Sequence, residues 1–214
     1  MVPRETAESF DLEPEPALAA ELFGAQIEHI RRFAALLASQ GETLGLIGPL
    51  ELPRLWTRHI VNCALLAPLV HDRTADVGSG AGLPGLVLAI ARPDVSFTLI
   101  EPMERRTDWL SSQARELELD NVTVLRARAE EAPKASFDVV TARAVGALSK
   151  LIPLTAPLVS AGGELVLLKG ATVEAEIAAA AKVVTRFRLR EARVEVLGDG
   201  MPTEPTRVFR ARVE

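Results

Sequence analysis

The residues best suited to chemistry lie in a glycine-rich segment at 76–85, which reads DVGSGAGLPG. This segment begins within a short apolar run at 75–77 and overlaps the start of a run with helical periodicity at 84–91. Glycine lets the backbone turn tightly and lets a ligand lie against it without a clash with Cβ. Because doubly wound sheets bind nucleotides between their first strand and first crossover helix, we predict a ligand-binding turn here.

The spacing of these glycines distinguishes two classes of nucleotide ligand. A dinucleotide fingerprint would place its third glycine at position 83, which is leucine. The glycines instead occupy positions 78, 80 and 82, beginning two residues after Asp76, a spacing typical of S-adenosylmethionine (SAM) sites. Glu101 follows the next apolar run, 19 residues after Gly82. That is close to the roughly 20 residues expected for a carboxylate that accepts hydrogen bonds from ribose hydroxyls.

Two further segments follow later strands of the predicted sheet. The turn at Ala129 and Glu130 comes after a predicted strand at 122–125, and we predict that it contacts the adenine of SAM. Arg143 comes after a predicted strand at 137–141. A guanidinium there would hold a carboxylate, a phosphate or guanine O6 through bidentate hydrogen bonds, so Arg143 is the candidate catalytic residue.

The fourth predicted strand narrows the choice of methyl acceptor. Methyltransferases that act on exocyclic amines usually have an Asn/Asp-Pro-Pro-aromatic loop after this strand. Residues 137–144 read FDVVTARA and contain no such loop. Pyrimidine C5 needs a cysteine nucleophile, but the single cysteine, Cys63, lies in a predicted N-terminal helix and is interpreted as a small core residue. A purine N7 already presents a lone pair, so its methylation requires neither a base nor a covalent nucleophile.

The distribution of charge leaves RNA binding open. The net charge is −5, but residues 1–28 contain seven acids and one base, so the rest of the chain carries +1. Local patches govern nucleic-acid binding more than overall charge does. The candidate RNA contacts are Arg54, Arg58, His59 and Lys169. One cysteine and three widely separated histidines offer little material for a metal site, and none is predicted.

Alternating strands and helices are predicted to position these residues. Strands are expected at 75–77, 96–100, 122–125, 137–141 and 164–168, with helices at 84–91, 104–117, 147–159 and 173–183. Such βαβ units build a parallel sheet covered by helices on both faces. Residues 187–196 and 206–213 have no helix between them and are expected to form an antiparallel hairpin at the end of the sheet. This α/β, doubly wound arrangement is that of class I SAM-dependent methyltransferases.

The chain is predicted to have three parts. Residues 1–14 are interpreted as an acidic, flexible arm, and residues 15–71 as a helical extension with amphipathic helices at about 17–40 and 51–69. Residues 72–214 form the SAM-binding core. No apolar run approaches the roughly 20 residues of a membrane span, and the first 20 residues lack the apolar region of a signal peptide. A cytoplasmic protein without a membrane partner is expected.

Taken in order, these motifs resemble those of the RsmG family, also called glucose-inhibited division protein B. The matching segments are RHI at 58–60, the glycine segment with its LPG ending, RR at 105–106, RAE at 128–130, SFD at 136–138 leading to RA at 143–144, and LKG at 168–170. The sequence departs from the family pattern at 62–63, where Asn-Cys replaces Asp-Ser. The resemblance covers nearly everything except the acidic arm.

The resemblance implies SAM-dependent methylation of guanine N7 in 16S ribosomal RNA, in the 530 loop at position 527, within the 30S subunit. With the motif analysis, it assigns cofactor binding to Asp76, Gly78, Ser79, Gly80, Gly82, Leu83, Glu101, Ala129, Glu130 and Arg143. A monomer is expected. Two alternatives remain: a SAM-dependent methyltransferase of a small molecule, and a non-catalytic SAM-binding protein associated with the ribosome.

Overall fold

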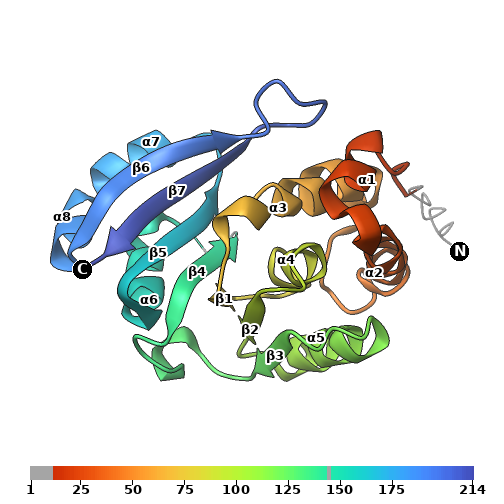
Figure 1. Cartoon of the computed structure of the whole chain (residues 1–214), viewed down its shortest axis with the longest axis horizontal. Coiled ribbons are helices and arrows are strands. Elements are labelled where there is room, and N and C mark those ends of the chain that lie inside the picture. Colours follow the sequence, from red (N-terminus) through yellow and green to blue (C-terminus); the bar gives the residue numbers. More distant parts are fainter. Residues whose placement is uncertain (1–11, 144–145) are drawn as a thin grey trace, which may run out of the picture.

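The computed structural model describes residues 12–143 and 146–214. Seven strands in these ranges form one sheet in the order β3-β2-β1-β4-β5-β7-β6 (Figure 1). The strands are β1 (Arg73–Val77), β2 (Ser96–Ile100), β3 (Val122–Leu125), β4 (Phe137–Arg143), β5 (Val159–Lys169), β6 (Leu189–Leu197) and β7 (Thr206–Val213). The first five are parallel, and β7 lies between β5 and β6, antiparallel to both. The predicted doubly wound sheet with a terminal hairpin is confirmed.

The strand register brings three strand ends to one edge of the sheet. Val77 ends β1 and pairs with Ile100, which ends β2. On the other side of β1, β4 runs in the same direction and ends at Arg143. The segments that follow these three strands therefore converge at one edge, where open α/β sheets bind their ligands.

Helices cover both faces of the sheet (Figure 1). On one face, α4 (Gly85–Ala91) and α5 (Glu104–Glu116) share an apolar core with the N-terminal helices. On the other face, α6 (Leu148–Thr155), α7 (Val173–Ala179) and α8 (Ala181–Arg186) form a second core. Neighbouring strand residues alternate between the cores: Leu99 belongs to the first and Ile100 to the second, as the two-residue period of a strand requires.

The N-terminal extension is less regular than predicted. It consists of α1 (Ala17–Phe23), η1 (Gly24–Gln26), α2 (Ile27–Gln40), η2 (Pro49–Arg54), η3 (Leu55–Val61), α3 (Asn62–Ala64) and η4 (Ala67–Leu69), in which η3 is a π-helix and the other η elements are 3-10 helices. The continuous helix over 17–40 is wrong because Gly24, with a φ of 49°, ends α1. The single helix over 51–69 is also wrong, since Pro53 lacks the N–H that an α-helix would use there.

Two core helices also differ from their predicted lengths. The helix expected at 147–159 ends at Thr155 and continues as the 3-10 helix η6 (Ala156–Leu158), while Val159 already begins β5. The helix expected at 173–183 is divided at Ala180, which separates α7 from α8. These differences lie away from the edge at which β1, β2 and β4 end.

The described end of the predicted acidic arm is held against the extension. The Glu13 N–H donates to the Leu52 carbonyl at 3.0 Å, and the Glu13 carboxylate accepts from the Thr57 N–H at 2.9 Å. The chain is thus anchored from Glu13 onward, while residues 1–11 of the predicted arm lie outside the described residues. Among the helices that the structure describes, none is long and apolar enough to cross a membrane.

Candidate active site

A cavity of about 780 Å³ lies over the glycine-rich turn, and we call it the glycine-loop cavity. Eight of the ten predicted cofactor-binding residues line it: Gly78, Ser79, Gly80, Leu83, Glu101, Ala129, Glu130 and Arg143. The backbone at Gly78 and Gly80 has φ angles of 72° and 54°, a left-handed conformation that glycine adopts without strain. The turn therefore exposes bare backbone to the cavity.

The other two predicted cofactor residues lie behind this turn. Asp76 is fully buried, its Oδ2 accepts from the Gly85 N–H at 3.0 Å, and it is not part of the cavity lining. Gly82 packs on α4, because a Cβ at this position would lie 2.4 Å from Leu86 Cδ1. Asp76 and Gly82 therefore support the conformation of the turn without lining the cavity. Burial raises the pKa of Asp76 to about 7, against the opposing effects of Ser79, Gly85 and Arg143.

Glu101 connects the second strand to the glycine turn. Its carboxylate is 2% exposed and accepts hydrogen bonds from the N–H groups of Gly80 and Met103, both at 3.0 Å. The Arg106 guanidinium lies 3.8 Å from the same carboxylate and also lines the cavity. Arg106 was named in the sequence only as part of the RR motif at 105–106 and was not predicted to line the site. Helical periodicity does not show which of two adjacent arginines lies near the end of a strand.

The turn after β3 also lines the cavity. Ala129 begins the 3-10 helix η5 (Ala129–Glu131) and is buried, while Glu130 is exposed at the rim. The Ala129 carbonyl accepts from Lys134 Nζ at 2.9 Å, which ties the turn to the segment before β4. Trp109, on α5, donates its indole N–H to the Ala81 carbonyl at 3.0 Å and so fixes the glycine turn from the helix side.

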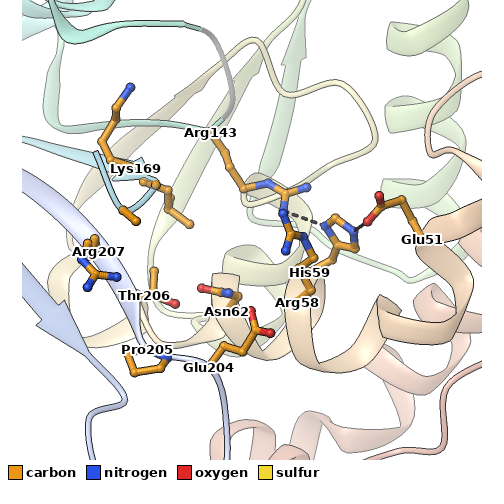
Figure 2. A pocket seen from close by; sticks show the side chains of 13 residues that line it. Glu51, Arg58, His59, Asn62, Arg143, Lys169, Glu204, Pro205, Thr206 and Arg207 are labelled. Carbon is orange, nitrogen blue, oxygen red and sulfur yellow. Dashed lines mark hydrogen bonds and ion pairs between the residues drawn. The ribbon is translucent and has the colours of Figure 1, made fainter. Parts of the chain in front are cut away.

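A second cavity, of about 570 Å³, adjoins the first at Arg143, and we call it the arginine cavity. It is lined by Glu51, Arg58, His59, Asn62, Arg143, Leu168, Lys169, Gly170, Ala171, Glu204, Pro205, Thr206 and Arg207 (Figure 2). These residues come from the N-terminal extension, the ends of β4 and β5, and the start of β7 with the loop before it. Arg143 is the residue that lines both cavities in the described ranges.

Arg143 is held by a chain of hydrogen bonds (Figure 2). One terminal nitrogen of its guanidinium lies 2.8 Å from His59 Nδ1, and His59 Nε2 lies 2.5 Å from a Glu51 carboxylate oxygen. Burial lowers the pKa of His59, and the charges of Arg143 and Arg58 lower it further, while Glu51 opposes them. The imidazole is therefore neutral, with Nε2–H donating to Glu51 and Nδ1 accepting from Arg143.

The four predicted RNA contacts occupy different surroundings. Arg58 is exposed and lines the arginine cavity, and His59 lines it from a buried position. Arg54 lies outside the lining and makes two hydrogen bonds to Glu51, at 3.0 and 2.6 Å. Lys169 lines the cavity with its stem, but its ammonium donates to the Gly146 carbonyl at 2.6 Å and pairs with Glu176 at 2.7 Å.

Sequence reasoning missed part of the arginine cavity. The β6–β7 loop contributes Glu204 and Pro205, and β7 contributes Arg207, although these residues form no recognisable motif. Only the insertion of β7 beside β5 brings them to the site. Asn62, one of the departures from the family pattern, also lines this cavity and is half-buried.

The glycine-loop cavity has the properties that a SAM site requires. Its volume lies within the roughly 300–1,000 Å³ of small-molecule pockets. Its lining combines bare glycine backbone and a buried carboxylate with apolar side chains such as Leu46, Ile100 and Leu154. The glycine backbone would suit the amino-acid end of SAM, the carboxylate would suit its ribose, and the apolar side chains would suit its adenine. In residues 12–143 and 146–214, no group of three or more His, Cys, Asp or Glu side chains lies together as a metal site would need.

Comparison with known proteins shows the family. The model of the GidB family, described as rRNA small subunit methyltransferase G, matches residues 26–203. The ribosomal RNA small subunit methyltransferase G of Leifsonia xyli subsp. xyli is 63% identical over 204 residues, which cover 94% of this chain and 98% of that protein. The protein of the same name from Clavibacter michiganensis subsp. michiganensis is 59% identical, with coverage of 94% and 97%.

Solved structures at lower identity show the fold. The crystal structure of M. jannaschii TYW2 in complex with AdoMet superposes with a TM-score of 0.57 at 18% identity, covering 74% of this chain and 77% of that one. This likeness confirms a class I SAM-dependent methyltransferase fold. The family match extends over most of the chain and confirms the resemblance found in the sequence. The chain belongs to the rRNA small subunit methyltransferase G family.

Proposed function

We propose that this protein transfers a methyl group from SAM to N7 of a guanine in 16S ribosomal RNA. The observation that carries the proposal is the position of Arg143, whose side chain lines both the glycine-loop cavity and the arginine cavity. A methyl donor in one cavity and a nucleotide in the other would meet at this residue. The names of the family and of its relatives support the choice of small-subunit rRNA as substrate.

The residues of the glycine-loop cavity would hold the cofactor in a fixed orientation. The turn at Gly78 and Gly80 accommodates its methionine part, Glu101 accepts hydrogen bonds from the ribose, and the Ala129–Glu130 turn borders the adenine. When bound, SAM would supply its methyl group to an acceptor lone pair by in-line displacement: the new bond forms at the methyl carbon while its bond to sulfur breaks, and S-adenosylhomocysteine leaves. The protein contributes mainly by positioning the two reactants, which accounts for a large share of the rate in such reactions.

The described residues around Arg143 favour an acceptor that needs no activation. Cys63, the single cysteine, is fully buried, and burial raises the pKa of its thiol to about 11. It therefore does not supply the thiolate that pyrimidine C5 methylation requires. His59 has both ring nitrogens engaged with Arg143 and Glu51. Guanine N7 has a free lone pair and suits a site that holds its reactant without deprotonating it.

The arginine cavity supports RNA as the substrate through charge. Arg58 is exposed at its wall, and Arg207 reaches it from β7 with about a third of its side chain exposed. Both guanidiniums suit phosphate groups, because the planar arginine fork matches their geometry. We propose that the protein acts as a monomer in the cytoplasm on the assembled 30S subunit, and that the 530 loop presents the target guanine at position 527.

Transfer of labelled methyl groups from SAM tests this proposal. The acceptors are 30S subunits from a strain lacking the modification, the same subunits already modified, and the extracted 16S RNA. Incorporation into the unmodified subunits alone, mapped to guanine N7 by mass spectrometry, is the expected result. Transfer to small molecules without RNA would support a small-molecule methyltransferase. SAM binding without transfer to any acceptor would support a non-catalytic protein.

A further inference from the structure

Three side chains from distant parts of the sequence form a continuous hydrogen-bonded chain beside the arginine cavity (Figure 2). Glu51 lies in η2, His59 lies in η3, and Arg143 ends β4. We propose that Glu51 and His59 are positioning residues that hold the guanidinium of Arg143 between the two cavities. This inference rests on the proposed function, and it gives His59 a role other than the RNA contact predicted from sequence.

The geometry leaves His59 no free ring nitrogen for a phosphate. A guanidinium only donates, so the 2.8 Å contact with Arg143 requires His59 Nδ1 to accept and therefore to carry no proton. The remaining ring proton lies on Nε2, which donates to Glu51 at 2.5 Å. The His59 side chain is 11% exposed. Its contacts are thus directed into the protein, toward the arginine rather than toward solvent.

Glu51 is itself fixed from a second side. Its carboxylate accepts two hydrogen bonds from Arg54, at 3.0 and 2.6 Å, in addition to the one from His59. This bidentate ion pair orients both carboxylate oxygens. Because Arg54 does not line the arginine cavity, its pairing with Glu51 explains its place in the structure without an RNA contact. The chain of hydrogen bonds therefore begins at an anchored group.

The backbone that carries His59 is also immobilised. The π-helix η3 buries Leu55, Trp56 and Ile60 in the core that it shares with α4, and Val61 is buried as well. A π-helix turns successive side chains through a smaller angle than an α-helix, and such segments are frequent at functional sites. Here Arg58 stays exposed, while the adjacent His59 is buried and its imidazole contacts Arg143.

Fixing Arg143 matters because a free arginine side chain has many rotamers, and a flexible guanidinium cannot serve two neighbouring cavities at once. One terminal nitrogen donates to His59, which restricts the directions that the guanidinium can take. Within residues 12–143 and 146–214 its other N–H groups make no further hydrogen bond, and they would be available to SAM and to the nucleotide. Donors that are oriented before the reactants arrive need no reorganisation during the reaction. The chain from Glu51 would therefore act on the rate of transfer.

The test is a double-mutant cycle in the full-length protein, measured as single-turnover methyl transfer to unmodified 30S subunits at pH 8. We expect His59→Leu to lower the rate at least tenfold in the wild-type background and less than twofold in the Arg143→Ala background. The affinity for SAM, measured by calorimetry, should change less than threefold. Glu51→Gln, whose amide oxygen still accepts from His59, should remain within threefold of wild type, whereas Glu51→Leu should resemble His59→Leu.

Controls separate positioning from stability. His71→Gln changes an exposed histidine far from both cavities and should leave the rate unchanged. If His59→Leu does not fold, His59→Gln, whose amide oxygen can accept from Arg143, takes its place and should recover part of the rate. Equal losses in both backgrounds, or a full rate with His59→Leu, would overturn the inference while the proposed function stands. No transfer by the wild type to any acceptor would defeat both.

Discussion

Asp76 offers a quantitative test of how the glycine turn is supported. Asp76 lies near the end of β1, behind the glycine turn. Its Oδ2 accepts a hydrogen bond from the Gly85 N–H, and its Oδ1 is buried without a hydrogen-bond partner among the described residues. Burial is the main reason that its pKa rises to about 7. The variant Asp76→Asn keeps a carbonyl oxygen for Gly85 but never ionises. It should therefore remove the pH dependence that Asp76 gives to folding.

The sign follows from the two pKa values. In the unfolded chain the carboxyl titrates near 3.8, whereas in the folded protein it titrates near 7. Between these values the folded state holds a proton that the unfolded state has lost, so stability falls as the pH rises. From pH 5 to pH 8 the loss amounts to about 3 kcal/mol. For a protein of this length, 1 kcal/mol corresponds to roughly 2–4 °C in Tm, so the expected loss is about 6–12 °C.

Thermal melting of both proteins at pH 5, 6, 7 and 8 measures this effect. The Tm of Asp76→Asn minus that of the wild type should become more positive by about 6–12 °C across the series. Asp199→Asn, at an exposed position in the β6–β7 loop, removes the same charge and should show no such trend. A constant difference for Asp76→Asn would mean that Asp76 is already ionised at pH 5, which would refute the reasoning.

Substitutions at three further positions test the cavities directly. Gly80→Val forces a branched residue into a left-handed conformation at the cavity wall, so calorimetry should show SAM affinity reduced at least tenfold, or about 1.4 kcal/mol. Glu101→Ala removes a charged acceptor and should weaken SAM binding by roughly 1–3 kcal/mol in the same assay. Arg143→Ala should keep the Tm within a few degrees while kcat/KM for 30S subunits falls about tenfold or more, and Arg143→Lys should recover only part.

Much of the core could be predicted from the sequence because its signals are local. The strands at 96–100 and 122–125 match their predicted bounds, since short apolar runs between helical segments have few other structures open to them. The helix types of the N-terminal extension are harder to predict, for a physical reason. A helical period shows which side chains face a core, but it does not show whether the backbone bonds follow the 3-10, α or π pattern. The π pattern of η3, which packs against α1 and α2, is therefore seen only in the structure.

The two cavities also differ in how far their lining residues can be predicted from the sequence. Most of the glycine-loop cavity lies within motifs in which residue type and spacing carry the chemistry, so eight of its lining residues were found. The arginine cavity is assembled from segments that are far apart, and its β6–β7 loop has no motif. His59 was assigned to RNA because it stands next to Arg58 in sequence. Its actual partner, Arg143, is 84 residues away, and only the fold brings the two together.

The N-terminal extension therefore does more than cover one face of the sheet. It supplies one wall of the arginine cavity through Glu51, Arg58, His59 and Asn62, and it provides the hydrogen bond that orients Arg143. The sheet alone would place a guanidinium at the end of β4 with its direction unspecified. Because the same extension also presents Arg58 to the cavity, it would connect the proposed RNA contact with the orientation of Arg143. Loosening the extension should consequently reduce methyl transfer before it reduces SAM binding, since nearly all of the predicted SAM contacts follow β1, β2 and β3 and Arg143 is the exception.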